Sequence, residues 1–232
     1  MSVDILTGLE KIPVFYPGEN REVYYPETDG TEMGQNSIHF WLVNNLAQML
    51  GLFFAWRKDV FVTGDIMLYY EKGEPKKFVA PDLMICFGVR NTPRRVYELW
   101  KEDVPPSIIF EIASESTWQK DVSRKLALYE RIGVQEYYIY DPERNYLPNP
   151  LLAYQLKDGE YELIETKNSR IYSPLLNLEL VDDGFSLKFF NHETIEYLPT
   201  ILELAAKERI AKNKIEQLEN EIAKLKKQND GK

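Results

Sequence analysis

The chain has 232 residues, 44% of them hydrophobic and 13% aromatic, which is enough apolar material for one large domain or for one domain with appendages. Its 28 basic and 37 acidic residues give a net charge of −9, which argues against a nonspecific nucleic-acid binder that acts through overall positive charge. The single cysteine, Cys86, excludes an intrachain disulfide, and its apolar surroundings favour a buried structural thiol. No apolar run approaches the roughly 20 residues that cross a bilayer. The first residues lack the features of a signal peptide, so we expect a cytoplasmic protein without a membrane partner.

Helical and strand-like patterns alternate along the first half of the chain. Apolar residues recur at helical spacing over 37–52, where Gly51 can end a helix. Gly64 and Asp65 mark a bend or bulge between two apolar runs. The predicted elements of this part are a helix over 37–52, two strands within 53–70, a loop over 71–77, a strand over 78–88 and a loop with a helical turn over 89–106.

A β-α-β unit follows over 107–142. Strand-like runs at 107–113 and 134–142 flank a helical pattern at 117–133, with Thr117 as a possible N-cap and Gly133 as the stop. This order implies a parallel strand pair with a right-handed crossover. A hairpin over 151–166 and two short strands within 173–190 complete the body. We therefore predict an α/β fold of the α+β kind, with a mixed, curved sheet and a helix on each side.

The C-terminal segment, 200–232, has its own pattern and is predicted to be separate from the domain formed by 1–199. Its apolar residues fit a and d positions of one heptad register, with Glu208 as the one polar intruder: Ile201, Leu204, Ala211, Ile215, Leu218, Ile222 and Leu225. This spacing favours a short coiled coil that forms a homodimer or binds a partner. The alternative is a lone amphipathic helix packed on its own body.

Two acids stand in apolar strands. Glu111 shares a strand face with Ile109 and Ala113, and Asp82 opens the strand over 78–88. An unpaired carboxylate in such surroundings costs several kcal/mol or must change its pKa, so a metal ion, a cation or a proton should compensate it. If the two strands are adjacent, one Mg²⁺ would satisfy both acids. The alternatives are a buried ion pair for Glu111 and a capping role for Asp82.

Lys125 lies on the crossover helix that follows Glu111. Asp121 and Tyr129 flank it at i−4 and i+4. A lysine beside a carboxylate pair can hold a scissile phosphate, orient the attacking water and counter developing charge. The Tyr129 hydroxyl is a candidate to line the site and contact the substrate. The alternatives are a structural salt bridge from Lys125 to Asp121 and a core role for Tyr129.

Six stretches of the sequence carry a resemblance to a known family: YPETDGTEMGQNSIHF, DVFVTGDIMLYY, VAPDLMICFG, IIFEIASEST, DVSRKLALYERIGVQEYYIYDP and SPLLNL. From about Tyr25 to Leu180 the chain resembles the PD-(D/E)XK nuclease superfamily, and more closely the Uma-type restriction endonucleases abundant in cyanobacteria. The resemblance implies a restriction-endonuclease-like core in which Asp82 and Glu111 bind metal. The superfamily lysine normally stands at the place of Ala113, and the family moves it to the helix, at Lys125.

The function that the resemblance implies is a Mg²⁺-dependent endonuclease, with Mn²⁺ as a possible substitute, that hydrolyses phosphodiester bonds of double-stranded DNA as a homodimer. A rival prediction is a binding or assembly module that kept the nuclease fold and lost turnover. Hydrolysis of a small phosphorylated ligand is a third, because the same metal chemistry serves it.

Several further residues are weaker candidates. Gln35 stands where relatives often carry a glutamate, and is expected to contact a metal-bound water. Arg124 belongs to a basic set, with 90–95, Lys76, Lys77 and Lys120, that either follows the phosphates or forms ordinary solvated loops. Asp65, Glu115 and His39 are more easily explained as a turn aspartate, a solvated loop acid and a satisfied helix histidine.

Overall fold

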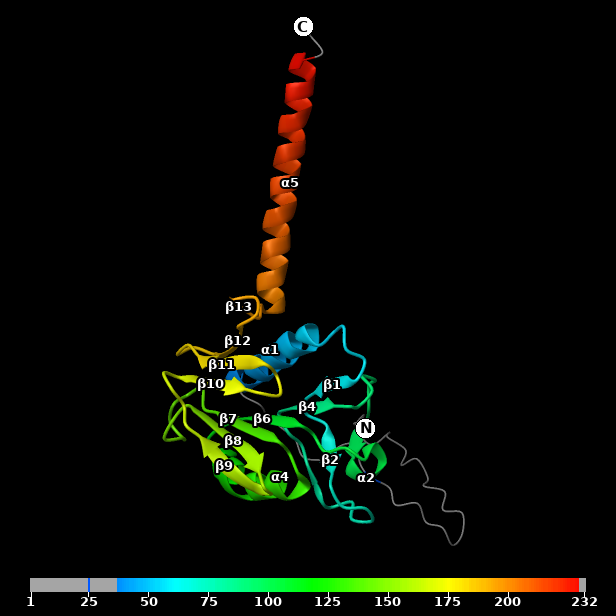
Figure 1. Ribbon diagram of the computed structural model, residues 1–232, viewed down its shortest axis with the longest axis vertical. Helices are drawn as coiled ribbons and strands as arrows, with labels where there is room; N and C mark the ends of the chain where they lie inside the picture. The colour runs from blue at the N-terminus through cyan, green and yellow to red at the C-terminus, as the bar shows by residue number, and fades with distance from the viewer. Residues whose placement is uncertain (1–24, 26–36, 230–232) are drawn as a thin grey trace, which may run out of the picture.

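The computed structural model describes Tyr25 and residues 37–229, so Gln35 lies outside the described residues (Figure 1). Its centre is a six-stranded sheet in the order β1–β4–β6–β7–β8–β9. The strands are β1 (Val60–Thr63), β4 (Leu83–Phe87), β6 (Ile108–Ile112), β7 (Glu136–Tyr140), β8 (Leu151–Lys157) and β9 (Glu160–Ile164). β6 and β7 pair in parallel, whereas the other neighbours in this order are antiparallel. The predicted mixed α/β architecture is confirmed.

The predicted β-α-β unit is present. A continuous helical segment connects β6 to β7, made of α3 (Trp118–Lys120), a π-helical turn η1 (Asp121–Lys125) and α4 (Leu126–Ile132). Gly133 ends it in the left-handed region, at φ 88°, and the N–H of Val134 reaches back to the carbonyl of Tyr129 at 2.9 Å. Thr117 occupies the predicted N-cap position, but its side chain makes no capping hydrogen bond.

Two smaller sheets flank the central one. One has the order β10–β11–β12–β13 and is antiparallel throughout; the other has the order β3–β2–β5, in which β2 and β5 are parallel. The strands of the first are β10 (Arg170–Ser173), β11 (Leu178–Asp182), β12 (Leu187–Asn191) and β13 (Glu196–Tyr197). The strands of the second are β2 (Met67–Tyr69), β3 (Phe78–Val79) and β5 (Val96–Glu98). The short helix α2 (Leu99–Glu102) follows β5.

Each face of the central sheet has its own apolar core. Helix α1 (Ser37–Phe53) and the β10–β13 sheet cover one face, where Leu46, Ile108 and Phe110 are buried. Helix α4 and the small β2–β3–β5 sheet cover the other face, where Ile109 and Tyr129 are buried. This arrangement confirms the prediction of a helix on each side. It follows from strand periodicity, because alternate residues of β6 enter opposite cores.

Some predicted boundaries are wrong for identifiable reasons. Phe53 is the last residue of α1, and the residues 54–59 form turns, so no strand begins at residue 53. The strand predicted over 78–88 is divided into β3 and β4, because Pro81 has no N–H to donate between them. β5 lies within the segment predicted as a loop. The hairpin β8–β9 has the predicted turn, with Asp158 and Gly159 both at positive φ.

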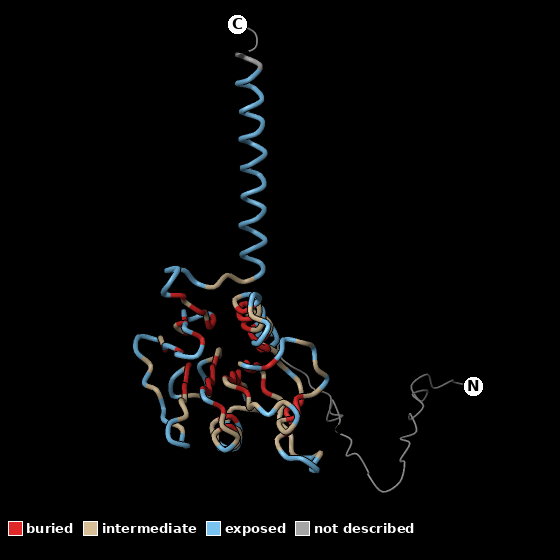
Figure 2. Tube along the Cα trace, turned by 45° about the vertical axis from the view of Figure 1, so that its right-hand side comes forward, coloured by how far each residue is buried: buried red, intermediate tan, exposed pale blue. Residues whose placement is uncertain are grey.

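Helix α5 (Ile201–Asn229) projects away from the body (Figures 1 and 2). Ile215, Leu218, Ile222 and Leu225 each expose between 44% and 56% of their surface. The alternative of a helix packed along its own body is therefore wrong. Whether residues 1–199 and 200–232 act as separate units stays a prediction. No helix in the described part of the chain combines the length and apolar character needed to cross a membrane.

Candidate active site

The two predicted metal-binding acids come from neighbouring strands. Asp82 immediately precedes β4, Glu111 lies within β6, and the two strands pair with Leu83 opposite Phe110. Asp82 Oδ2 accepts a hydrogen bond from the backbone N–H of Ile112 at 2.7 Å. The bond fixes Asp82 beside the residue that follows Glu111. Strand pairing thus brings together two acids that are far apart in the sequence.

Glu111 is held by two side chains of the crossover helix. Lys125 Nζ donates to Glu111 Oε2 at 2.7 Å, and the Tyr129 hydroxyl donates to Glu111 Oε1 at 2.6 Å. Glu111 is 1% exposed and Tyr129 is fully buried. Tyr129 therefore orients the acid and does not present its hydroxyl to solvent.

A π-helical turn carries the lysine. Such turns are rare, occur mostly as single turns within α-helices, and are frequent at functional sites. Here η1 begins at Asp121 and ends at Lys125, and Lys125 Nζ lies 3.0 Å from Asp121 Oδ1. The buried hydroxyl of Tyr137 donates to the Asp121 carbonyl oxygen at 3.0 Å, which fixes the start of the turn against β7. One ammonium group is thus shared by two buried carboxylates.

The cluster carries more negative than positive charge. Burial raises the pKa of Glu111 well above its usual range; Lys125 opposes this shift, and the charges of Asp82 and Asp121 add to it. Burial also raises the pKa of Asp121, against the effect of Lys125. Burial lowers the pKa of Lys125, but its carboxylate neighbours outweigh burial and raise it, so the ammonium stays charged. Three carboxyl groups, Asp82, Glu111 and Asp121, thus lie near Lys125, with His39 as a second cationic partner at Asp82, and a further cation would relieve the repulsion between them.

His39, which the sequence favoured as a satisfied helix histidine rather than a ligand, lies at the site. Its Nε2 lies 3.1 Å from Asp82 Oδ2, and the side chain is largely buried. Burial works against charge on Asp82, but the hydrogen bond and charge of His39 outweigh it and hold the pKa of Asp82 below its usual value. The available signal was the helical spacing that puts His39 on the same face as Leu42 and Leu46, toward the sheet. Asp121, predicted only as a structural partner of Lys125, also belongs to the cluster.

The donor set fits a hard divalent cation. Two carboxylates on adjacent strands, surrounded by excess negative charge, are the ligands that Mg²⁺ takes when water and phosphate oxygens complete its shell. Among the described residues, no group of three or more His, Cys, Asp or Glu side chains is arranged to hold a metal ion. A metal at Asp82 and Glu111 would therefore rely on water or substrate for its other ligands.

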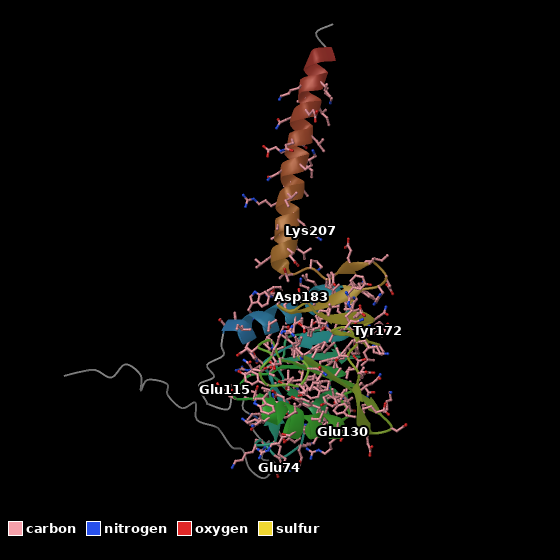
Figure 3. All side chains as sticks on the ribbon, turned by 90° about the vertical axis from the view of Figure 1, so that its left-hand side faces the viewer. Glu74, Glu115, Glu130, Tyr172, Asp183 and Lys207 are labelled. Atoms are coloured by element: carbon pink, nitrogen blue, oxygen red, sulfur yellow. The ribbon has the colours of Figure 1, made fainter. Side chains whose placement is uncertain are left out.

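The remaining candidates lie at the periphery. Arg124 is exposed and lines an open groove next to Lys125. Arg94, from the basic set, is paired with Glu102 and stacks on a phenylalanine ring, so it does not join this groove. Asp65 is exposed in a left-handed turn, as expected for a turn aspartate. Glu115 is exposed at the surface of the body (Figure 3).

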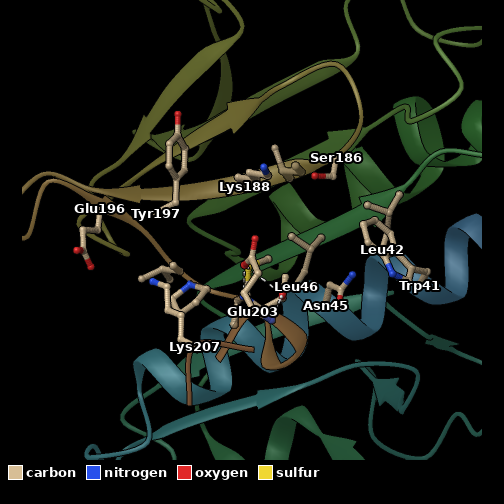
Figure 4. A pocket seen from close by; sticks show the side chains of 15 residues that line it. Trp41, Leu42, Asn45, Leu46, Ser186, Lys188, Glu196, Tyr197, Glu203 and Lys207 are labelled. Atoms are coloured by element: carbon tan, nitrogen blue, oxygen red, sulfur yellow. Dashed lines mark hydrogen bonds between the residues drawn. The ribbon is translucent and has the colours of Figure 1, made fainter. Parts of the chain in front are cut away.

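A separate cavity of about 430 Å³ lies between α1, the β12–β13 strands and the start of α5 (Figure 4). Trp41, Leu46, Tyr197 and Glu203 are among its lining residues. None of the site residues described above lines it. The candidate active site therefore stays at Glu111, whose carboxylate meets Tyr129 of α4, with His39 of α1 reaching Asp82.

The chain matches the model of a known protein family. The model of the Uma2 family, described as putative restriction endonuclease, matches residues 10–186. The chain belongs to the Uma2 family. This membership confirms the resemblance seen in the sequence and indicates a nuclease. It also agrees with the use of divalent metal ions, which restriction-endonuclease-like proteins generally need.

One solved structure similar to this Uma2 chain is a putative nuclease belonging to DUF820 from Anabaena variabilis ATCC 29413. The two are 14% identical, with a TM-score of 0.46 over 66% of this chain and 86% of that one. A search of curated protein sequences found no match. The assignment of site residues rests on the geometry described above.

Proposed function

We propose that this Uma2 protein is a metal-dependent endonuclease that hydrolyses phosphodiester bonds of DNA, with double-stranded DNA as the general substrate. The observation that carries the proposal is the pair Asp82 and Glu111, buried on adjacent strands beside the Lys125 ammonium. The exposed Arg124 next to Lys125 offers a first phosphate contact.

Each side chain has a distinct role in this proposal. Asp82 and Glu111 hold Mg²⁺ or Mn²⁺, which when bound polarises the phosphodiester and lowers the pKa of a coordinated water. Lys125 donates to a phosphate oxygen and counters the charge that develops there. Tyr129 and His39 position Glu111 and Asp82, respectively. In this proposal Gln35 contacts a metal-bound water.

One observation favours a second candidate function. Both oxygens of Glu111 accept hydrogen bonds within the protein, from Lys125 and Tyr129. A network of this kind is also what a nuclease fold without turnover would keep for structural reasons. That protein would bind or assemble without cleaving.

The experiment that separates the two candidates is cleavage of supercoiled plasmid and of linear duplex DNA with Mg²⁺ or Mn²⁺. The wild type is compared with Glu111→Gln and Lys125→Ala, and with the control Glu115→Gln at an exposed acid. The nuclease proposal expects the first two variants to lose at least about 100-fold in rate, and the control to cleave normally. Wild-type protein that cleaves neither substrate, or cleavage that persists in Glu111→Gln, would refute it.

The proposal includes a homodimer joined through α5. In the heptad register, β-branched Ile215 and Ile222 occupy a positions while Leu218 and Leu225 occupy d positions, a combination that favours parallel two-stranded coiled coils. The residues near the start of α5 that face the Figure 4 cavity are Thr200, Glu203 and Lys207, which leaves the a and d face open to a second copy.

Most charges beside the seam agree with a parallel pair. In a parallel dimer each g residue meets the e residue five positions later on the second copy. Lys214 then faces Glu219, and Glu221 faces Lys226, so these two contacts are attractive, whereas Lys207 faces Lys212 near the start of the helix, which is repulsive. Glu208, the polar residue at an a position, forms an ion pair with Lys212 at 2.7 Å, which partly compensates its charge.

A further inference from the structure

An open groove of about 590 Å³ borders the candidate active site at Lys125; Asp82 and Glu111 are not among the described residues that line it. One wall is the helical segment from α3 to α4, and the other is formed by Tyr70, at the end of β2, and by β3. Helix α4 and β2 lie side by side at the lower end of the body (Figure 1). Lys125, whose ammonium holds Glu111, itself lines the groove. Whatever occupies the groove therefore reaches the catalytic lysine.

Among the described residues, the groove is lined by four cations and by no carboxylate. The cations are Lys120, Arg124, Lys125 and Arg131, in a chain whose net charge is −9. The side chains of Lys120 and Arg124 are exposed and form no hydrogen bond or ion pair with another described residue. All four lie on the one helical segment from α3 to α4. A row of cations, of which Lys125 alone is paired with carboxylates among the described residues, suits a polyanion better than an isolated anion.

Aromatic rings face the cations across the groove. Tyr70 and Phe78 are half-buried on the far wall, and the Arg131 guanidinium lies 5.6 Å from the centre of the Tyr70 ring. Sites for single-stranded nucleic acid combine a positive groove, which follows the phosphates, with aromatic side chains on which bases stack. In a duplex the faces of the bases are stacked on one another, so a ring in the groove wall has nothing to contact.

We propose that this groove binds one unpaired DNA strand and leads it to the candidate active site. The phosphates lie along Lys120, Arg124 and Arg131, and a base stacks against Tyr70. This inference rests on the proposed nuclease function and narrows its substrate to DNA with a single-stranded segment, such as an overhang, a flap or a bubble. A fully paired blunt duplex lacks the base contact.

The test measures binding apart from catalysis. Full-length protein is titrated, in EDTA, into a fluorescent oligo(dT) of about 15 nucleotides and into a blunt duplex of equal length, and anisotropy is read at several salt concentrations. We expect the single strand to bind at least about tenfold more tightly than the duplex. Tyr70→Leu should weaken single-strand binding about tenfold. The double variant Arg124→Ala, Arg131→Ala should reduce the slope of log K against log salt by about 1.4, which is about 0.7 for each lost phosphate contact.

The control is Lys157→Ala, at an exposed lysine on β8 outside the groove. Circular dichroism checks that each variant is folded. Duplex binding equal to or tighter than single-strand binding, or groove variants that match Lys157→Ala, would overturn the inference. If the wild type still cleaves DNA in that case, only the groove assignment fails. If the wild type neither binds nor cleaves DNA, the proposed function fails with it.

Discussion

Few groups around Glu111 can stabilise its carboxylate in the charged form. It is 1% exposed, and Lys125, the only cation within hydrogen-bond reach among the residues that the structure describes, is shared with Asp121. Structural ion pairs usually balance their charges, because an unpaired buried charge is destabilising. An excess of buried carboxylates is more typical of a site that awaits a cation, and this imbalance is the strongest residue-scale argument for metal binding.

His39 should make stability depend on pH. Burial lowers the pKa of the imidazole, but the hydrogen bond to Asp82 and the charges of Asp82 and Asp65 together outweigh burial and raise the pKa above its usual 6.5. A raised histidine pKa adds stability that is fully present below pH 6.5 and is lost as pH rises through the folded value. The lowered pKa of Asp82 adds stability above about pH 3.8, lost as pH falls through its folded value.

The resulting prediction concerns His39→Gln in metal-free buffer. The loss of unfolding free energy relative to wild type should be largest near pH 5 to 6 and should shrink by pH 9, as measured by urea denaturation. His192→Gln, at the exposed second histidine, sets the baseline. A loss that stays constant or grows from pH 6 to pH 9 would show that His39 does not pair as a cation with Asp82.

Cys86 should be unreactive in the folded protein. It is fully buried on β4, and burial raises the pKa of its thiol to about 12. Since only the thiolate attacks disulfide reagents, we expect native protein to react with Ellman's reagent at pH 8 only through unfolding. Protein unfolded in guanidinium should release one equivalent at once. Complete labelling of native protein within minutes would contradict the buried position.

At the level of secondary-structure elements, the segment between β1 and β2 packs closely against the backbone of Asp82 at Gly64. A Cβ built on Gly64 would lie 2.2 Å from the Asp82 carbonyl oxygen, so any larger residue must push the two backbones apart. The N–H of Asp65 also donates to the Pro81 carbonyl at 3.1 Å. This contact fixes the backbone that carries Asp82.

Gly64→Ala should therefore lower the free energy of unfolding by about 1–3 kcal/mol and reduce DNA cleavage. The matched control is Gly51→Ala in α1, where an added Cβ meets nothing within 4 Å. That variant should be as stable as wild type, or more stable by up to about 1 kcal/mol. Equal stability of Gly64→Ala and wild type in chemical denaturation would disprove the close contact.

Local patterns predicted the elements better than their contacts. The β-α-β unit and the β8–β9 hairpin followed from strand periodicity and turn residues. The meeting of Asp82 and Glu111 was predicted on the condition that their strands are adjacent, and the pairing of β4 with β6 meets that condition. The contact of His39 with Asp82 did not follow from these patterns, because it depends on how α1 packs across the sheet. The π-helical turn at Asp121 has no sequence signature of its own. β10 and β13 went unpredicted because they are short and pair only within the second sheet.

At the scale of the whole molecule, α5 is the feature without a partner. A helix of 29 residues that exposes Ile215 and Ile222 by more than half leaves an apolar stripe in water along its length. Association with a second copy would cover that stripe and place two active sites on one assembly. A dimeric nuclease could then cut both strands of a duplex in one binding event.

The dimer predicts a specific response to mutation. The double variant Ile215→Asp, Ile222→Asp should sediment as a monomer at micromolar concentration, because two charges would enter the seam. Asn213→Asp, Asn220→Asp places the same charges at outward f positions and should stay dimeric. A disulfide through Leu218→Cys should form between chains only if the helices are parallel and in register. Wild-type protein that sediments as a monomer would contradict the proposal.

The most direct test of the central claim is calorimetric titration of the full-length protein with Mn²⁺, comparing wild type, Glu111→Gln and Glu115→Gln. If Asp82 and Glu111 form a metal centre, wild type and Glu115→Gln bind Mn²⁺ alike, and Glu111→Gln loses at least about tenfold in affinity. Wild-type protein that binds no Mn²⁺, or a Glu111→Gln variant that binds it as tightly as wild type, would contradict the claim and leave Glu111 as a buried structural acid.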